Sequence, residues 1–532
     1  MSSVAQDPCS EAVIQSSKSG EPCQKTLGRW ILAATILASS MAFIDGTVVN
    51  VALPFLQTEL NATAIGVQWV VESYSLFLAA LLLVGGSLGD RYGRRKIFVI
   101  GVAIFAIASL ACGFSLTIGQ LIIARAIQGI GGALLVPGSL AIISASFSKD
   151  QRRRAIGTWS GFSAITTAIG PVLGGWLVEH ISWRAVFFLN LPLAIAVIVI
   201  SLWRVPESKE KIQHGSLDWL GAALATLGLG GVVYGLIESS RMGFSDAPVF
   251  GSLIAGVVLL AFFVVNEARN SNAMMPLHLF RSGDFAGANL LTLFLYAALS
   301  GTLFFFTLAL IQVEHYSATA AGAALLPFVF IMFSLSRWSG GLMDRFGSRL
   351  PLTVGPIIAA AGFLFFAFAP SASSYWTGFF PAAIVLGLGM AISVAPLTTT
   401  VMDSVDAEQA GVASGINNAV SRAAGLIAIA VFGVLMLHSF GASLSQKLGT
   451  IQIPMEARQA LEEQAVRLGG IEIPATLTPQ TQKLVEQSIA DSFISGFRLL
   501  MYVSAGLAAA SALSAWLLIS GQSHKSDGTK AG

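Results

Sequence analysis

Three ionisable side chains lie inside apolar stretches of the sequence, where a charge is costly and therefore informative. Asp45 lies about fifteen residues into the first apolar stretch, and Arg125 lies early in the fourth. If these stretches cross a bilayer, an ionised aspartate at that depth costs roughly 2.5–3.5 kcal/mol, and such a carboxyl usually faces a water-filled cavity. Burial favours the protonated form of a carboxyl, so we expect Asp45 to bind and release a proton. Arg125 needs a partner of opposite charge.

Glu72 is the third of these side chains, in the stretch VQWVVESYSLFLAA. It lies about one helical turn from Trp69, and tryptophan is enriched where a helix meets the membrane surface. One interpretation is a carboxylate that only reaches the outer headgroup region. The other is a second proton-binding site, or an anchor for cations, at the outer end of a cavity. The sequence leaves both open.

The elements that must position these side chains are membrane-spanning helices. Of the 532 residues, 55% are hydrophobic and only 11% are charged, whereas soluble domains are about one quarter charged. A bilayer crossing needs roughly 20 apolar residues, and fourteen runs of that length occur. They begin near Trp30, Gly66, Ile97, Leu121, Ala155, Arg184, Leu217, Val249, Gly287, Ala320, Leu350, Trp376, Gly411 and Ser495. The sequence therefore predicts an all-α, multi-pass membrane protein.

The distribution of basic residues predicts the orientation of these helices. With the N-terminus inside, 20 of the 30 Lys and Arg residues fall in inner loops and tails and 6 in outer loops. Basic residues are retained on the cytoplasmic side, so both termini are expected to be cytoplasmic, in the plasma membrane. We expect residues 1–28 to form a disordered cytoplasmic tail, because they are polar and do not resemble a signal peptide. Residues 521–532 are the second cytoplasmic tail.

An internal repeat divides the chain. GGSLGDRYGRR matches SGGLMDRFGSR at an offset of 254 residues, so that Gly86, Asp90, Arg91, Gly93 and Arg95 correspond to Gly340, Asp344, Arg345, Gly347 and Arg349. The first copy follows the second span and the other follows the tenth. This placement favours two six-helix halves, residues 29–205 and 271–520, separated by a two-helix insert, residues 206–270. The second half contains a long polar outer loop, residues 438–494, for which a solvated lid and an inert spacer fit equally well.

The repeated loop has two possible roles. Its arginines and Lys96 could simply fix the topology, since they lie on the predicted inner side. Asp90 adds nothing to that rule, so we expect it to pair with Arg91 or Arg94, or with a neighbouring helix end, as a latch that closes the cytoplasmic side. The residues assigned to this cytoplasmic gate are Gly86, Asp90, Arg91, Gly93, Arg94, Asp344 and Arg345.

The stretch AIGPVLGGWL contains closely spaced small residues. Gly170 and Gly174 are four residues apart on one helix face, next to Pro171 and Gly175. Small residues at that spacing let two helices approach closely, and proline permits bending. These residues could serve helix packing alone, or they could form a tightly packed pivot between the two halves. The two roles are compatible.

Several function classes are excluded or disfavoured. The dipeptide Gly-Lys does not occur, so the chain has no Walker A loop and we expect no ATP site, cofactor or metal. The three cysteines have no metal-binding spacing, and the net charge of +2 gives no reason to expect nucleic acid. We expect a monomer whose partners are lipid, protons and small molecules; the sequence leaves periplasmic partners open.

Four motifs resemble those of a known family. GGSLGDRYGRRK resembles the loop signature of the major facilitator superfamily, and ARAIQGIGG resembles its Arg-containing motif of the fourth span. AIGPVLGGWL resembles the antiporter motif of the fifth span, and FIDGTVVNVALP resembles the first-span motif of the fourteen-span drug:proton antiporters. The resemblance extends from Trp30 to about Ile519.

The resemblance implies a fold and a function. It implies the major facilitator fold and a proton-coupled multidrug efflux antiporter, not an enzyme, with Asp45, Glu72 and Arg125 in the proton-coupling and substrate cavity and a proton-relay role for Arg125. The expected substrates are hydrophobic, cationic drugs or toxic compounds, moved by alternating access. The alternatives are export of a specific metabolite, lipid or siderophore-like compound on the same fold, and a non-transporting membrane receptor, which would have no use for a buried titratable group.

Overall fold

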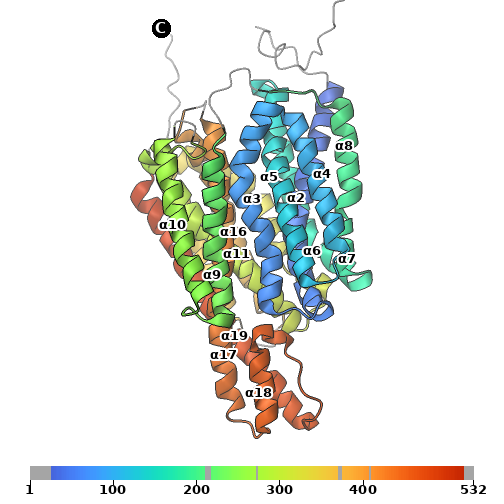
Figure 1. The fold of residues 1–532 in the computed structure, drawn as a ribbon. Helices are drawn as coiled ribbons and strands as arrows, with labels where there is room; N and C mark the ends of the chain where they lie inside the picture. Colours follow the sequence, from blue (N-terminus) through green and yellow to red (C-terminus); the bar gives the residue numbers. More distant parts are fainter. Residues whose placement is uncertain (1–24, 210–216, 271–272, 370–373, 407–408, 521–532) are drawn as a thin grey trace, which may run out of the picture. The chain divides into compact units, whose positions relative to one another are not determined.

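The structure is a computed structural model that describes residues 25–209, 217–270, 273–369, 374–406 and 409–520. Across these ranges the chain is nearly all helical and contains no β-strand (Figure 1). The predicted tail lies outside the described residues up to residue 24, but Lys25 to Gly28 already form the start of the first helix. Residues 521–532, the predicted second tail, also lie outside them.

The chain divides into two compact units by its internal contacts. The first unit consists of Met1–Met274, Phe304–Ala323 and Ile429–Phe493. The second consists of Met275–Leu303, Ala324–Ala428 and Ile494–Gly532. Three of the five boundaries, after Leu303, Ala428 and Phe493, fall inside long helices, and the two units do not correspond to the halves that the repeat suggests. The division into two halves and an insert stays a prediction.

The first 270 residues supply most of the first unit. Its helices are α2 (Lys25–Glu59), α3 (Ala64–Tyr92), α4 (Arg94–Gly113), α5 (Ile118–Ser146), α6 (Lys149–His180), α7 (Trp183–Phe188), α8 (Asn190–Arg204), α9 (Trp219–Met242) and α10 (Ala247–Arg269). Glycines allow α9 and α10 to pack closely, since a Cβ on Gly231 would lie 3.0 Å from the Ser252 carbonyl oxygen. These two helices form the predicted insert.

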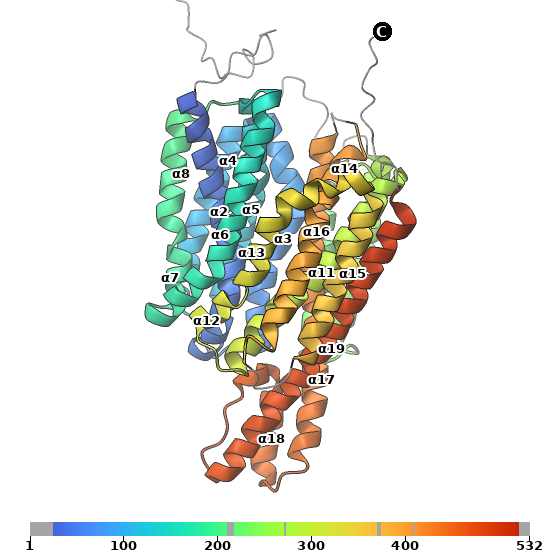
Figure 2. The same ribbon diagram turned by 180° about the vertical axis from the view of Figure 1, so that it is seen from behind.

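The rest of the chain begins with a short 3-10 helix, η1 (Leu277–Arg281), followed by α11 (Gly283–Gln312), α12 (Ala318–Ala323), α13 (Leu326–Gly340), α14 (Leu342–Phe346), α15 (Arg349–Phe368) and α16 (Phe379–Asp403). The last elements are α17 (Ala410–Leu448), α18 (Met455–Glu463), η2 (Gln464–Gly470) and α19 (Pro479–Leu518). The tenth apolar run is broken into α12 and α13 at Ala324 and Leu325. Figure 2 shows α12 beside α6, with which it shares the first unit.

The predicted number of membrane spans is confirmed, because fourteen helices in the described ranges are long and apolar enough to cross a bilayer. Thirteen begin within four residues of the expected position. The last begins at Pro479, sixteen residues before the expected start at Ser495. A polar helical extension precedes its apolar part, and hydropathy does not detect such an extension.

The predicted outer loop, residues 438–494, contains a folded helical subdomain. The last turns of α17, together with α18, η2 and the first turns of α19, surround the buried side chains of Leu444, Leu448, Leu461, Leu468, Val485 and Ile489. At about 1.5 Å per residue, the 39 residues of α17 extend to about 60 Å, roughly twice the hydrocarbon thickness. We call residues 438–494 the outer subdomain; α17, α18 and α19 are labelled in Figure 1.

Candidate functional site: a buried ion pair and an unpaired carboxyl

An ion pair between Asp45 and Arg125 lies in the interior of the first unit. Asp45 projects from α2 and Arg125 from α5, which begins where the Gln120 amide donates to Thr117 Oγ1 at 3.3 Å. Arg125 Nη1 lies 2.5 Å from Asp45 Oδ2. The side chains of Arg125 and Asp45 are 1% and 0% exposed. Two residues 80 positions apart in the sequence thus provide the opposite charges that each needs.

Two amide side chains and a hydroxyl complete the polar cluster around Asp45. Gln128 Nε2 and Asn190 Nδ2 donate to Asp45 Oδ1 at 2.8 and 3.2 Å. The same two amides donate to Ser109 Oγ at 2.8 and 3.2 Å, and Arg125 Nη1 donates to Gln128 Oε1 at 2.7 Å. Both oxygens of Asp45 therefore accept hydrogen bonds, from residues on α5 and α8.

The guanidinium of Arg125 is held on its other side as well. Its Nε donates to the Val70 carbonyl oxygen at 3.1 Å, and it lies 4.2 Å from the Tyr74 ring centroid. Cation–π contacts of this kind are worth more when they are desolvated. With this many partners, each charge of the pair is compensated and hydrogen-bonded. The expectation that Asp45 faces a water-filled cavity is wrong for this conformation, because Asp45 is fully buried against Arg125.

Sequence reasoning missed three members of this cluster. Gln128 follows Arg125 by three residues, so helical periodicity already placed it on the same face. Asn190 interrupts the apolar run VFFLNLPLAIAV, a signal of the same kind as Asp45. Ser109 gives no signal, because a serine in a membrane helix commonly bonds its own backbone.

Glu72 is buried in a different way. Its side chain is 0% exposed, and neither carboxylate oxygen has a hydrogen-bond partner among the described residues. An ionised carboxylate buried without partners is too costly to persist, so the group is a neutral carboxylic acid in this conformation. The headgroup interpretation does not fit, because a side chain that reached the membrane surface would be exposed.

The face of α3 that carries Glu72 is covered by helices from distant parts of the sequence. One turn before it, Gln68 Nε2 donates to the carbonyl oxygen of Ile429 on α17 at 2.9 Å. One turn after it, Leu76 lies against Gly230 of α9, since a Cβ added to Gly230 would be 3.4 Å from the Leu76 side chain. Residues four apart share a helix face, so Glu72 faces the region that α9 and α17 cover. The predicted insert thus forms one wall around this carboxyl.

Trp69 fixes this wall to α3. Its Nε1 donates to Glu238 Oε1 of α9 at 3.2 Å, and its ring centroid is 6.3 Å from that of Tyr234. Glu238 also bonds Arg241, so its charge is partnered. The anchor that the sequence suggested at Trp69 therefore has a specific partner in the insert.

The repeated loop forms an ion pair of its own. Asp90 Oδ1 accepts from Arg94 Nε at 2.8 Å, which joins the end of α3 to the start of α4. Gly93 between them has φ 112°, and a Cβ there would meet Glu207 Oε1 at 2.7 Å, so only glycine fits. The arginine that follows, Arg95, lies 3.6 Å from Glu207.

Glu207 is a loop residue that sequence reasoning missed. Its carboxylate accepts from the backbone amides of Arg95 at 3.0 Å and Lys96 at 3.1 Å. A carboxylate at a helix N-terminus satisfies amides that have no partner within the helix and interacts favourably with the helix dipole. The end of the first copy of the loop is therefore tied to the chain that follows α8.

The remaining gate residues fall into two groups. A Cβ on Gly86 would lie 3.7 Å from Pro137, an ordinary van der Waals contact. The close approach of α3 to α5 occurs instead at the neighbouring Gly85, where a Cβ would lie 2.0 Å from the Ala133 carbonyl oxygen. Arg91 lies 5.7 Å from the Tyr92 ring. In the second copy, Gly347 has φ 69°, as the match with the first copy leads one to expect, and Arg345 is exposed on α14. The side chain of Asp344 lies outside the described part of the structure.

The small residues of α6 permit close contacts with two helices. A Cβ on Gly170 would meet Thr47 Oγ1 of α2 at 2.4 Å, and one on Gly174 would overlap the side chain of Val48. A Cβ on Gly175 would meet the Ala318 carbonyl oxygen of α12 at 2.3 Å. In return, a Cβ on Gly322 of α12 would lie 2.2 Å from the Pro171 carbonyl oxygen. The motif thus packs α6 against α2 and α12.

This geometry defines the class of the protein. Fourteen helices of the described residues are apolar enough to cross a bilayer, and the first unit buries an ion pair and a further carboxyl, a polar interior suited to moving a solute or a proton. The family model described as Major Facilitator Superfamily matches residues 35–429, which is most of the chain. The chain belongs to the major facilitator superfamily, and it is a transporter rather than an enzyme.

Its relatives include exporters of drugs and antibiotics. The tetracenomycin C resistance and export protein of Streptomyces glaucescens is 33% identical over 484 residues, covering 90% of this chain and 89% of the relative. The multidrug resistance protein Stp of Mycobacterium tuberculosis (strain CDC 1551 / Oshkosh) is 34% identical over 499 residues, covering 91% of each. The cephamycin export protein CmcT of Amycolatopsis lactamdurans is 33% identical, covering 78% of this chain and 86% of the relative.

Solved structures show the same fold at lower identity. A bacterial homologue of the human lysosomal transporter Spinster aligns with TM-score 0.63 and 17% identity, covering 92% of this chain and 98% of that one. A D-xylose–proton symporter aligns with TM-score 0.57 and 14% identity, covering 93% and 98%. These similarities establish the major facilitator fold.

Proposed function

We propose that this transporter is a proton-coupled antiporter of the plasma membrane that exports hydrophobic, cationic drugs by alternating access. The names of its relatives support drug export as the direction and the substrate class. The single observation that supports proton coupling best is the carboxyl of Glu72, which is buried with no hydrogen-bond partner for either oxygen among the residues that the structure describes.

A carboxyl in this state can be satisfied in two ways. In the present conformation a proton neutralises it. In a conformation that admits water or a cationic substrate, the proton is released and the carboxylate pairs with the cation. Proton and cation therefore compete for one group, and this competition produces exchange: the site returns with a proton after it has released a cation.

The pair of Asp45 and Arg125 has a different part in this proposal. Its charges are satisfied, so it stabilises the packing of α2 against α5 while Glu72 changes its protonation. Protonation of Asp45 would release Arg125 and leave an uncompensated buried charge, at a cost of roughly 3–5 kcal/mol. Asp45 thus becomes a second proton site only in a conformation that gives Arg125 another partner.

The number of carboxyls that titrate decides the electrical character of transport. One proton exchanged for a monovalent cation moves no net charge, so only the pH gradient drives it. A second proton adds one net charge per cycle, worth about 2.3 kcal/mol per 100 mV of membrane potential. With Glu72 alone titrating, we expect electroneutral export of monovalent cations.

We assign the loop around Asp90 and Arg94 to the cytoplasmic gate. Its ion pair joins α3 to α4, and Glu207 fixes the start of α4. Opening on this side would have to separate these contacts or move them as one piece. We expect Asp344 and Arg345 to play the corresponding part in the second copy.

Export of one specific compound is the alternative that a specific observation favours. Two relatives are named for single antibiotics, tetracenomycin C and cephamycin. The carboxyl chemistry at Glu72 is the same in either case, but the range of substrates would be narrow. Failure of the purified protein to transport lipophilic cations that it binds would favour this alternative.

The test uses purified protein in proteoliposomes with an imposed pH gradient and ethidium, an aromatic cation, as the transported probe. Native protein should move ethidium in a gradient-dependent manner. Glu72→Gln should lose gradient-driven transport and bind ethidium less tightly, because the neutral amide mimics the protonated acid, which does not pair with a cation. The matched control is Glu59→Gln, a partly exposed carboxylate paired with Arg184, which should behave as native. Full gradient-driven transport by Glu72→Gln would refute the proposal.

A further inference from the structure

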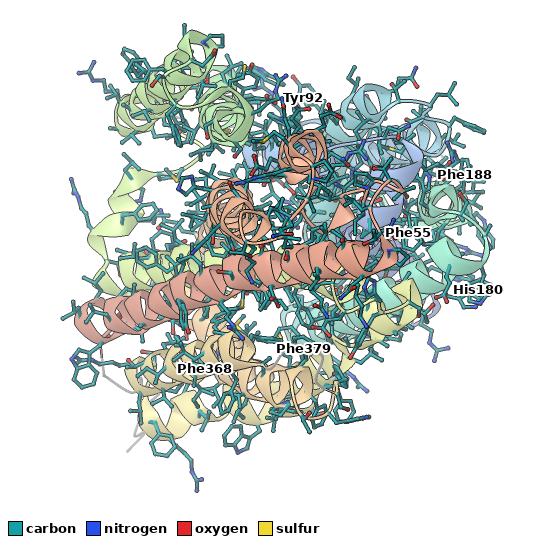
Figure 3. All side chains as sticks on the ribbon, turned by 90° about the horizontal axis from the view of Figure 1, so that it is seen from below. Phe55, Tyr92, His180, Phe188, Phe368 and Phe379 are labelled. Atoms are coloured by element: carbon teal, nitrogen blue, oxygen red, sulfur yellow. The ribbon has the colours of Figure 1, made fainter. Side chains whose placement is uncertain are left out.

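A cavity of about 300 Å³ lies within the first unit at the predicted outer end of α2. Its walls come from three segments that are distant in sequence: the end of α2, the end of α11, and η2 with the residues that follow it. Phe55, labelled in Figure 3, and Ile311 give it apolar surface. Its volume is at the lower end of the range for ligand sites, so it can hold a ring system of a few fused or linked rings.

The polar wall of the cavity is a chain of amides. Gln312 Nε2 donates to Gln57 Oε1 at 2.8 Å, and Gln57 Nε2 donates to the Arg467 carbonyl oxygen at 3.0 Å. The chain fixes the orientation of both amides. It leaves Gln312 Oε1 buried with no hydrogen-bond partner among the described residues. A buried acceptor of this kind is costly, and a turn of the Gln312 side chain toward the cavity would let a donor on a ligand satisfy it.

The charges at the cavity cancel each other. Among the described residues that line it, only Arg467 and Glu472 are charged, and Arg467 Nη1 donates to Glu472 Oε1 at 2.9 Å. A ligand therefore meets apolar surface and amide groups rather than an unpaired charge. The contrast with Glu72, a bare carboxyl deeper in the same unit, is clear.

The outer subdomain holds the η2 wall in place. Glu462 accepts from Arg458 Nε at 3.0 Å and from Ser445 Oγ at 2.9 Å, which ties α18 to the end of α17. Lys447 Nζ lies 3.0 Å from Asp491 Oδ2, which ties α17 to α19. The segment that follows α18 is thus attached to a folded base, as the wall of a preformed site should be.

We propose that this cavity is an outer binding site of the transporter, for exported compounds that combine an aromatic or apolar ring with an N–H donor. The ring would contact Phe55 and Ile311, and the N–H would donate to Gln312 Oε1 once that side chain has turned toward the cavity. The proposal rests on the proposed export function, since it makes the cavity the last site that a compound occupies before it leaves. It also gives the outer subdomain a role beyond that of a spacer.

The paired charges explain why such a site would release its ligand. A cation that competes with a proton for Glu72 is held by charge, and it leaves only when a proton replaces it. A cavity with no unpaired carboxylate holds the same compound by contact area and one hydrogen bond, so it exchanges readily with water. We therefore expect ethidium to bind weakly from the outside, so that it must be added in large molar excess over the protein to occupy the cavity.

Protection of an introduced cysteine from labelling tests the site directly. Thr58→Cys, in a chain whose native Cys9, Cys23 and Cys112 are replaced by serine, places a single thiol at the cavity. A membrane-impermeant maleimide applied from outside should label Thr58→Cys, and excess ethidium should slow that labelling at least fivefold. Met455→Cys, on α18 at a position that is 76% exposed, is the control whose labelling ethidium should leave unchanged.

A second substitution fills the cavity without breaking its walls. A Cβ on Gly470 would lie 3.5 Å from Gln57 Oε1, an ordinary contact, so Gly470→Leu adds volume where the ligand would sit. Protection of Thr58→Cys by ethidium should be lost in this background. Gly441→Leu, where a Cβ meets nothing within 4 Å, is the matched control and should preserve protection.

Three results would overturn the proposal: labelling of Thr58→Cys only from the inner side, no slowing by ethidium, or protection that survives Gly470→Leu. Gradient-driven transport measured on the same preparations separates this proposal from the function on which it rests. Transport without protection would reject the outer site alone. Protection without gradient-driven transport would support the site as a binding site and reject proton-coupled export.

Discussion

Asp45 and Glu72 are both carboxyls, both fully buried, and lie on consecutive helices of one unit, yet their surroundings are opposite. Asp45 accepts hydrogen bonds on both oxygens and faces the charge of Arg125. Glu72 has no hydrogen-bond partner within the described part of the chain. Burial alone does not make a carboxyl a proton carrier. Fixed partners compensate the charge of one carboxyl, whereas a buried carboxyl without partners depends on a proton until its surroundings change.

Asp45 and Glu72, which the sequence placed in one proton-coupling site, therefore have different functions. A satisfied ion pair stabilises one arrangement of helices and resists titration. An unsatisfied acid makes the arrangement around it depend on a proton. An antiporter needs both, because a group that changes its charge must be held by neighbours that do not.

The largest effect should come from removing one member of the satisfied pair. Arg125→Leu leaves the Asp45 carboxylate buried beside two amides but without a charge partner, at a cost of roughly 3–5 kcal/mol in the free energy of unfolding. Unfolding of the purified protein by SDS in mixed micelles measures this cost. Combining it with Asp45→Asn should recover part of the loss, because the buried charge is gone. A double variant less stable than the single one would mean that the pair is not the source of the effect.

The next prediction compares the two carboxyls directly. Asp45→Asn leaves the charge of Arg125 buried without its partner and should cost roughly 3–5 kcal/mol. Glu72→Gln replaces a neutral acid by a neutral amide of the same shape and should change stability by less than about 1 kcal/mol. The same SDS titration measures both. Equal losses would show that Glu72 is ionised or partnered in the folded state.

A smaller loss is expected from crowding α6 against the helix that carries Asp45. A Cβ on Gly174 would overlap Val48 of α2, so Gly174→Ala should cost roughly 1–3 kcal/mol through overpacking. Gly157→Ala on the same helix is the control, because a Cβ there meets nothing within 4 Å and alanine favours a helix by up to about 1 kcal/mol. Measured in parallel, thermal inactivation should be faster than native for Gly174→Ala and slower than native for Gly157→Ala.

The smallest effect concerns a carboxylate that is partnered but exposed. Hydrogen bonds from Arg458 and Ser445 hold the pKa of Glu462 below its usual value. A carboxyl whose pKa is lower in the folded than in the unfolded state adds stability above its unfolded pKa and loses it as the pH falls through the folded value. We expect the outer subdomain to loosen slightly below about pH 4.5, less so in Glu462→Gln, and solvent screening keeps the difference small.

Hydrogen exchange of amides in residues 440–490 between pH 3 and pH 6 would detect it. Lys483→Gln, on the polar start of α19, is a control for a general change of surface charge. A pH response in that variant equal to the one in Glu462→Gln would argue against the specific contribution of Glu462.

The fold was predictable from the sequence to a large extent, for reasons visible in particular elements. Hydropathy located fourteen spans because lipid demands long apolar runs, and the repeat at Gly93 and Gly347 reappears as two glycines with positive φ. The early start of α19 at Pro479 was not predictable, because hydropathy does not distinguish a polar helical extension from any other polar segment. The folded outer subdomain was missed for the same reason.

The site was predictable in its members but not in their pairing. A charge within an apolar run singled out Asp45, Glu72 and Arg125. Which of them would pair depends on helices that meet only in three dimensions, and the cover over Glu72 comes from α9 and α17, more than 150 residues away in the sequence. Long-range packing of this kind leaves no local pattern, so the difference between the two carboxyls needed the structure.

The most direct measurement of the central claim is proton release when ethidium binds to the purified protein in weakly buffered detergent solution. The account predicts release of about one proton per ethidium bound by the native protein, little or none by Glu72→Gln, and continued release by Glu59→Gln. Undiminished release by Glu72→Gln, together with its loss in Asp45→Asn, would contradict the account and make Asp45 the proton carrier.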